Sequence, residues 1–172
     1  MSKAVLTSIR PQWCEKIASG EKIIEVRKTR PKMETPFKCY IYCTNGETVR
    51  MPPRAYRKNI DGSIVYKQEI MNGKVIGEFV CDQIDTLLPA NEPYGIYNID
   101  DDYVFQTCLE YGALWDYGNG QTLYGWHISN LKIYDEPKEL GEFTGLRKTK
   151  FGMEPVAITR PFQSWGYVEE LP

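Results

Sequence analysis

The sequence has little that would place it in a membrane or outside the cell. No apolar run approaches the roughly 18 residues that a membrane-spanning helix needs. The first residues, MSKAVLTSIR, lack the apolar stretch and the cleavage site of a signal peptide. The five cysteines are odd in number and lie in apolar segments, as buried thiols do in a reducing compartment. We therefore expect a cytoplasmic protein that has free thiols and does not contact a membrane.

Metal-binding patterns are also scarce. The chain has one histidine, His127, and no C-x-x-C pair, while Cys39 and Cys43 fall in one apolar segment. A structural zinc site normally needs four closely spaced Cys or His ligands. We expect neither a metal ion nor another cofactor.

Internal repeats, low-complexity tracts and clear linkers are absent from the sequence as well. The chain has 172 residues, of which 42% are apolar and 13% aromatic, which is enough for one hydrophobic core. The sequence therefore predicts a single domain over residues 1–172. We expect its core within residues 4–143, and we expect the proline-interrupted residues 144–172 to wrap over the surface.

What the sequence does contain is an uneven distribution of charge. Residues 1–60 have 13 Lys and Arg against 5 Asp and Glu, whereas residues 61–146 have 4 against 15. Clustered basic residues replace the counterions that condense on nucleic-acid phosphates. The basic first third therefore favours contact with a nucleic acid. The alternative is that the two segments neutralise each other within the fold.

The first third of the sequence predicts strands around one helix. Residues 4–9 form an apolar strand, and Pro11 suits the first turn of a helix over residues 11–19. Gly20 is expected to end this helix in the left-handed conformation. The segment 22–30 then reads as a strand, and FKCYIYCT alternates as a second strand with one inward face.

The middle of the sequence predicts further strands and a second helix. Asn72-Gly73 fits the tight turn of a hairpin within residues 63–84. Acidic residues followed by apolar residues at helical spacing predict a helix that starts near residues 99–101. Residues 121–137 read as a strand with a break near Ser129-Asn130. These elements imply a small, mixed, bent sheet or partly open barrel with a helix at one end.

The stretch SGEKIIEVRK, residues 19–28, places three charged residues beside an apolar strand. The twofold alternation of a strand puts Glu25 and Arg27 on one face. Lys22 has the wrong parity to join them unless the chain turns near Gly20. A guanidinium, an ammonium and a carboxylate together suit a polar ligand with donors and acceptors. The alternative is an ion-paired strand without a ligand.

Gly20-x-Lys22-x-x-Glu25-x-Arg27 resembles the G-x-K-x-x-E-x-R signature of the ASCH domain, a family related to the RNA-binding PUA domain. The later strings GKVIGEFVCDQI and YGWHISNLKIYDEPKEL also resemble strands of ASCH proteins from bacteria and their phages. The resemblance implies an α+β, mainly β fold: a PUA-like small mixed β-barrel with a helix plugging one end and one further helix. It implies an RNA- or nucleotide-binding module whose polar cleft contains the four motif residues.

A resemblance to one branch of that family implies an alternative function. Some small ASCH-type proteins are acetylcytidine amidohydrolases, with a catalytic lysine at the position of Lys22 and a threonine at the position of Glu25. The lysine is present here and the threonine is not, so a deacylating enzyme would use Lys22 with Glu25. The downstream glutamate of that branch corresponds to Glu92 or Glu110.

Further candidate ligand contacts come from aromatic and basic residues. Tyr124 and Trp126 alternate on one strand and could stack a base, or could pack in the core. His127 is expected to be a packed, hydrogen-bonded histidine. A predicted loop, VRMPPRAYRKN, offers phosphate contacts or is simply a solvated loop. Its basic residues are Arg50, Arg54, Arg57 and Lys58. The expected partner is RNA or a nucleotide-like small molecule, with single-stranded DNA as the second choice.

Overall fold

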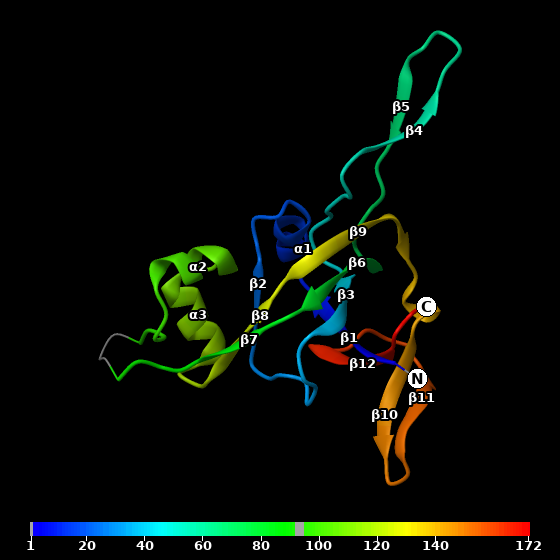
Figure 1. Ribbon diagram of the computed structural model, residues 1–172. Coiled ribbons are helices and arrows are strands. Elements are labelled where there is room, and N and C mark those ends of the chain that lie inside the picture. Colours follow the sequence, from blue (N-terminus) through cyan, green and yellow to red (C-terminus); the bar gives the residue numbers. More distant parts are fainter. Residues whose placement is uncertain (1, 92–94) are drawn as a thin grey trace. The chain divides into compact units, whose positions relative to one another are not determined.

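The structure is a computed structural model that describes residues 2–91 and 95–172 (Figure 1). Strands predominate, which confirms the predicted α+β, mainly β class. In chain order the elements are β1 (Lys3–Ile9), α1 (Pro11–Ala18), β2 (Ile24–Arg27), β3 (Phe37–Cys43), β4 (Arg54–Lys58), β5 (Ile64–Lys67), β6 (Lys74–Cys81), β7 (Ile84–Leu87), α2 (Asp101–Thr107), α3 (Tyr111–Gly118), β8 (Leu123–His127), β9 (Ser129–Lys138), the 3-10 turn η1 (Leu140–Glu142), β10 (Thr144–Thr149), β11 (Gly152–Ala157) and β12 (Trp165–Glu169).

The residues group into two compact units. The first unit contains residues 1–15, 39–78 and 132–172, and the second contains residues 16–38 and 79–131. None of the helices in the described part of the chain is long and apolar enough to cross a membrane.

A seven-stranded sheet with the order β11-β10-β12-β1-β3-β6-β9 organises the first unit. Its centre is β1, which pairs antiparallel with β12 and parallel with β3. Alternate residues of β1 face a core under the sheet because successive side chains of a strand point to opposite faces. The buried members of that core are Ala4, Leu6, Tyr40, Tyr42, Val75, Tyr134, Phe143 and Val168.

The sheet is open rather than closed into a barrel. Strands β11 and β9 are the two ends of its order, and β2, β8 and β7 form a separate three-stranded sheet. The described residues contain no closed barrel, while the α+β, mainly β fold implied by the family resemblance is present. Two helices, α2 and α3, also take the place of the one further helix that we expected. The periodicity missed α3 because Gly112 and Gly118 lower its helix propensity.

The hairpin expected around Asn72-Gly73 is wrong. Strand β5 pairs with β4, and the turn of this hairpin contains Gly62 at φ +87°. Gly73 does adopt a positive φ, of +75°, as a turn residue would. The side chain of Asn72 shows that this turn belongs to a loop. The Asn72 amide accepts from the backbone of Val49 and donates to the carbonyls of Thr44 and Glu47, so it fastens a loop instead of turning a hairpin.

Residues 144–172 are more regular than their prolines suggested. They form β10, β11 and β12, and β12 is an inner strand of the sheet, between β1 and β10. Pro155 is tolerated because β11 is an edge strand, where a missing N–H donor costs no ladder bond. Val168 of β12 is fully buried, so this segment belongs to the core and does not merely cover it.

The second unit packs the sheet β2-β8-β7 against α2 and α3. Ile24 and Val26 of β2 share a buried cluster with Leu87 and Leu123 of the sheet and with Val104 of α2 and Leu114 of α3. Gly125 of β8 is required here, because a Cβ at this position would lie 1.9 Å from the hydroxyl of Tyr103 on α2. The opposite face of the same sheet carries the motif residues Glu25 and Arg27.

Candidate functional site

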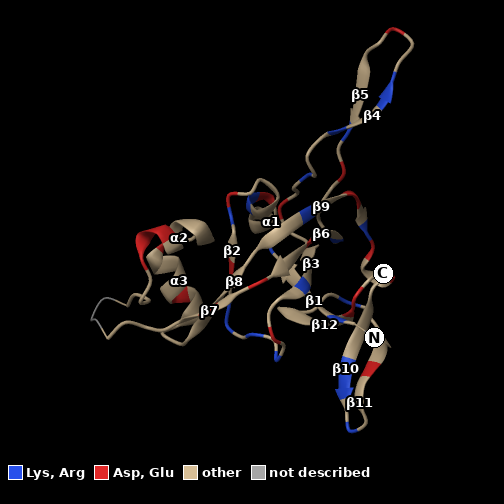
Figure 2. Cartoon of the chain, viewed as in Figure 1, with Lys and Arg blue, Asp and Glu red and all other residues tan. Residues whose placement is uncertain are grey.

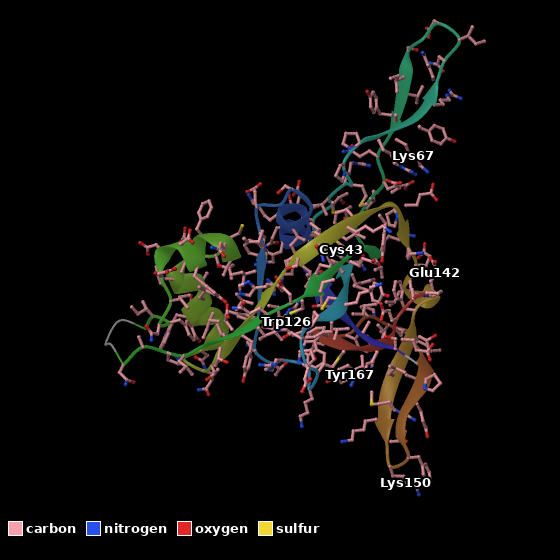
Figure 3. The ribbon with its side chains drawn as sticks, in the orientation of Figure 1. Cys43, Lys67, Trp126, Glu142, Lys150 and Tyr167 are labelled. Carbon is pink, nitrogen blue, oxygen red and sulfur yellow. The ribbon has the colours of Figure 1, made fainter. Side chains whose placement is uncertain are left out.

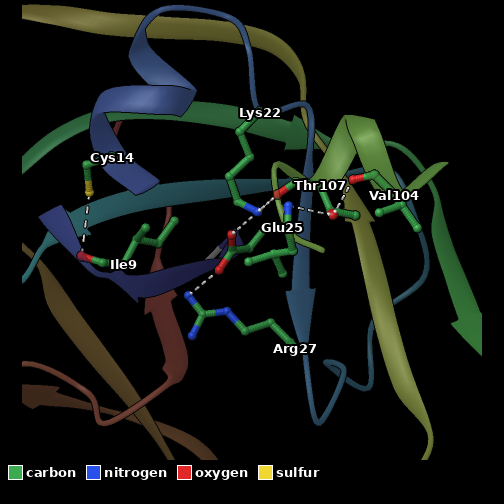
Figure 4. Close-up of polar contacts among 8 residues, drawn as sticks. Ile9, Cys14, Lys22, Glu25, Arg27, Val104 and Thr107 are labelled. Carbon is green, nitrogen blue, oxygen red and sulfur yellow. Dashed lines mark hydrogen bonds and ion pairs between the residues drawn. The ribbon is translucent and has the colours of Figure 1, made fainter. Parts of the chain in front are cut away.

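The Lys22, Glu25 and Arg27 side chains meet on the face of β2 opposite Ile24 and Val26. Gly20 follows α1 in the left-handed conformation, with a φ of +82°. Two residues later, the Lys22 N–H donates to the carbonyl of Lys16. This turn places Lys22 before the strand begins and removes the parity conflict with Glu25. The convergence of the three charged residues is therefore observed (Figure 4).

The carboxylate of Glu25 lies between the two cations. Its Oε2 is 3.4 Å from Lys22 Nζ, and its Oε1 is 3.0 Å from a terminal nitrogen of Arg27. The side chains are 2%, 8% and 8% exposed for Lys22, Glu25 and Arg27. Charges so far removed from water persist only when they are paired and hydrogen-bonded, which this geometry provides.

Lys22 also connects the strand to the end of α2. Its Nζ donates to the Thr107 carbonyl at 2.6 Å (Figure 4). Thr107 is the last residue of α2, and Cys108 follows it in the left-handed conformation. The last carbonyls of a helix lack intrahelical partners and carry partial negative charge, so an ammonium is well placed there. The Lys22–Glu25–Arg27 trio thus links β2 to α2 within the second unit.

The trio forms a compact buried network in this structure. Its ionic groups bind one another and the end of α2, and very little of their surface contacts water. Gly20 contributes backbone conformation: it is exposed, and a Cβ built on it meets nothing within 4 Å. The sequence motif therefore has a clear structural role in the second unit.

The two aromatic candidates of β8 have different environments. Trp126 lies opposite Glu25 in the β2–β8 ladder, is fully buried, and packs edge-to-face on Phe37 with ring centroids 6.2 Å apart (Figure 3). Tyr124 lies opposite Arg27 and is half-buried. Trp126 therefore packs in the core, which was the alternative to stacking a base. Tyr124 remains partly exposed.

The basic candidates gather on the β4–β5 hairpin of the first unit (Figure 2). Arg54, Arg57 and Lys58 belong to β4, so the segment predicted as a loop is a strand, and Arg50 bridges to Ile70 just before it. Lys67 and two tyrosines add to the same hairpin. Tyr56 and Tyr66 are 63% and 62% exposed. The sequence identified the charges and missed the hairpin because its pairing needs a register shift between Ala55 and Arg57.

The structure describes one of the two candidates for the downstream glutamate, Glu110. Glu92 lies outside the described residues. Glu110 is exposed at the start of α3, and it makes no side-chain capping bond. A carboxylate that does lie next to Lys22 is that of Glu25, at 3.4 Å.

A second polar cluster of the second unit was not predicted as a group. His127 of β8 lies 2.5 Å through Nε2 from Asp85 Oδ2, and Gln83 Nε2 donates to Asp85 Oδ1 at 2.6 Å. With the carboxylate as acceptor, Nε2 of His127 carries the proton. Burial alone would raise the pKa of Asp85, but the hydrogen bonds from His127 and Gln83 outweigh burial and lower it. The sequence predicted a hydrogen-bonded His127, but it could not identify Asp85 of β7 as the partner.

This cluster predicts a specific dependence of stability on pH. A carboxyl group whose pKa is lowered by folding stabilises the protein fully above its unfolded value, about 3.9, and loses that contribution as the pH falls through the folded value. Replacement of Asp85 with asparagine should therefore flatten the acid limb of a plot of thermal midpoint against pH between pH 2 and 5. Parallel curves for wild type and Asp85→Asn would contradict this assignment.

Comparisons with known proteins identify the fold. No protein-family model matches the sequence, and no curated protein matches it. The solved ASCH structure from Zymomonas mobilis matches with a TM-score of 0.53 at 17% identity, over 80% of this chain and 73% of that one. Two substituted variants of the ASCH protein from Zymomonas mobilis match with TM-scores of 0.52 and 0.53 at 15% and 16% identity. They cover 98% and 97% of this chain and 92% and 89% of theirs. The chain thus has the fold of ASCH structures, as the motif around Lys22 predicted.

Proposed function

We propose that the protein is an RNA-binding ASCH module whose β4–β5 hairpin contacts the RNA backbone. The observation that carries the proposal is the composition and exposure of this hairpin. Residues 50–70 contain five basic residues against two acidic ones, and every residue of β4 after Arg54 is exposed. Lys and Arg contact phosphates without reading the sequence, and exposed tyrosines stack on unpaired bases.

Two of the basic residues are fully available to a ligand. Arg54 is paired with Glu136 at 2.9 Å, and Lys67 with Glu69 at 2.5 Å. The hydrogen bond that Lys67 donates to the Glu69 carboxylate raises the pKa of Lys67, so this lysine stays charged. Arg57 and Lys58 have no acidic partner within the described part of the chain. They can therefore meet phosphates without breaking an existing ion pair.

The double substitution Arg57→Ala with Lys58→Ala tests this proposal. We expect affinity for several unrelated single-stranded RNAs to fall by about the same factor. The slope of log K against log salt should become shallower by about 1.4, since each lost phosphate contact contributes roughly 0.7 on single strands. Fluorescence anisotropy with labelled RNA measures both quantities.

Lys150→Ala provides the matched control, because Lys150 lies at the turn of the other exposed hairpin, β10–β11. It should leave RNA affinity unchanged. A loss confined to one RNA sequence would show that the hairpin reads bases, and a salt-independent affinity would refute backbone contact. DNA of the same sequence shows whether RNA is preferred.

The alternative is an amidohydrolase that uses Lys22 and Glu25 to deacylate acetylcytidine. It is supported by one observation, the 3.4 Å separation between Lys22 Nζ and the Glu25 carboxylate. Against it weigh the burial of Lys22 and the two acceptors that its Nζ contacts, since a catalytic base must be deprotonated and accessible.

We expect no turnover of acetylcytidine by the wild-type protein in a chromatographic assay over hours. An enzyme would lose activity in both Lys22→Ala and Lys22→Arg, because an arginine stays charged and cannot act as a base. A binding module would instead keep its RNA affinity in Lys22→Arg, with circular dichroism confirming that the variant is folded. Hydrolysis by wild type that disappears in both variants would favour the enzyme.

A further inference from the structure

Strands β10 and β12 of the first unit diverge from a single point. Strand β10 pairs with β11 along its whole length. Its pairing with β12 in the described residues is limited to one position, where Gly145 lies opposite Val168. Beyond this pair the β10–β11 hairpin leaves the sheet, and residues 158–164 return the chain to β12 (Figure 1). A groove of about 810 Å³ lies in the fork. Its volume is in the range of small-molecule sites.

The wall of this groove is fixed by hydrogen bonds and by close packing. The Ser8 hydroxyl donates to the Phe162 carbonyl at 2.6 Å, and the Ser8 N–H donates to the Ser164 carbonyl at 2.8 Å. A Cβ at Gly166 would lie 2.3 Å from the Phe162 ring, so this ring lies directly on the backbone of β12. A groove held in this way needs little ordering when a ligand binds.

The groove combines positive charge with aromatic surface. Its lining includes Arg147, Lys148 and Arg160, all exposed, and none of the described lining residues is acidic. Trp165 and Tyr167 belong to the lining too, with ring centroids 5.4 Å apart in an edge-to-face pair (Figure 3 labels Tyr167). Cationic side chains suit a phosphate, and aromatic and apolar side chains suit a planar ring.

We propose that this fork binds a nucleotide, with its phosphate near Arg147, Lys148 and Arg160 and its base against the aromatic wall. Charge complementarity selects an anion, and the apolar remainder of the lining selects a ligand with an aromatic body over a bare ion. The site lies on elements other than the β4–β5 hairpin and the Lys22–Glu25–Arg27 trio. It therefore rests on its own observations and does not depend on the RNA contact proposed for the hairpin.

Isothermal titration of the full chain with AMP, adenosine and inorganic phosphate tests the site. AMP is expected to bind at least tenfold more tightly than either adenosine or phosphate, because only AMP engages both parts of the groove. The double substitution Arg147→Ala with Arg160→Ala should weaken AMP binding at least tenfold. Both residues are exposed, and thermal unfolding confirms that the variant is folded.

Two controls separate this site from the hairpin. Lys150→Ala, on the same β10–β11 hairpin but outside the lining, should leave AMP affinity unchanged. Arg57→Ala with Lys58→Ala should also leave it unchanged even where RNA affinity falls. Equal affinity for AMP and phosphate, loss of AMP binding in either control, or no binding of AMP at millimolar concentration would each overturn the proposal.

Discussion

Replacement of Glu25 with glutamine is expected to lower the free energy of unfolding by about 3–5 kcal/mol, the usual cost of breaking a buried ion pair. The substitution preserves the shape of the side chain but removes the negative charge that Glu25 places between Lys22 and Arg27. Two cations then remain buried next to each other. Urea denaturation followed by circular dichroism measures the loss directly.

A matched control for this substitution lies four residues upstream. Glu21 pairs with Lys16 at 2.6 Å, but the side chains are 45% and 56% exposed for Lys16 and Glu21. Glu21→Gln should leave the urea midpoint almost unchanged, because exposed ion pairs contribute little to stability. A small effect at both positions would mean that water reaches Glu25, and would return the trio to consideration as an open ligand site.

A triple variant separates structure from ligand binding at the trio. Lys22→Met, Glu25→Leu and Arg27→Met together replace the buried charges by apolar groups of similar volume, which is often neutral or stabilising. If the trio only links β2 to α2, this variant should be folded and should bind RNA as the wild type does. A folded triple variant without RNA binding would show that the motif contacts the ligand.

Replacement of Trp126 with alanine is the second change with a large expected effect, a loss of about 3–5 kcal/mol in the free energy of unfolding. Trp126 is fully buried and packs on Phe37, so its removal leaves a cavity in the second unit. Trp126→Phe should cost less because an aromatic ring still fills most of the volume. Urea denaturation of both variants checks the order.

The same two variants decide whether Trp126 has a role in binding. If Trp126 is only a core residue, the folded Trp126→Phe variant should bind RNA with the affinity of the wild type. Tyr124→Ala is the comparison on the same strand, where the residue is partly exposed. A drop in RNA affinity for Trp126→Phe without loss of stability would contradict the core assignment and restore base stacking.

The sequence predicted the trio because local rules govern it. Strand alternation brought Glu25 and Arg27 together, and the turn at Gly20 brought in Lys22. Local rules could not predict that the trio is buried. It depends in part on the Thr107 carbonyl, which lies 85 residues away along the chain, and on how α2 packs against β2.

Strand pairing shows the same division between local and distant information. The periodicity located most strands, including the interruption between β8 and β9, and Asn130, just after that interruption, adopts a φ of +48°. It could not choose partners, so β5 was assigned to β6 when it pairs with β4. The side chain of Asn72 binds the backbone near residues 44–49, and a turn motif alone cannot distinguish that role from a hairpin turn.

The pairing of β1 with β12 sets the order of events on the ribosome. Lys3 lies opposite Glu169, and the Glu170 N–H donates to the Ser2 carbonyl, so β1 remains without this partner until β12 has been synthesised. Until β12 leaves the exit tunnel, the nascent chain presents one edge of β1 without its partner, and exposed strand edges invite pairing with other chains. Such high contact order slows folding, so the first unit can complete its sheet only after translation of residues 165–169.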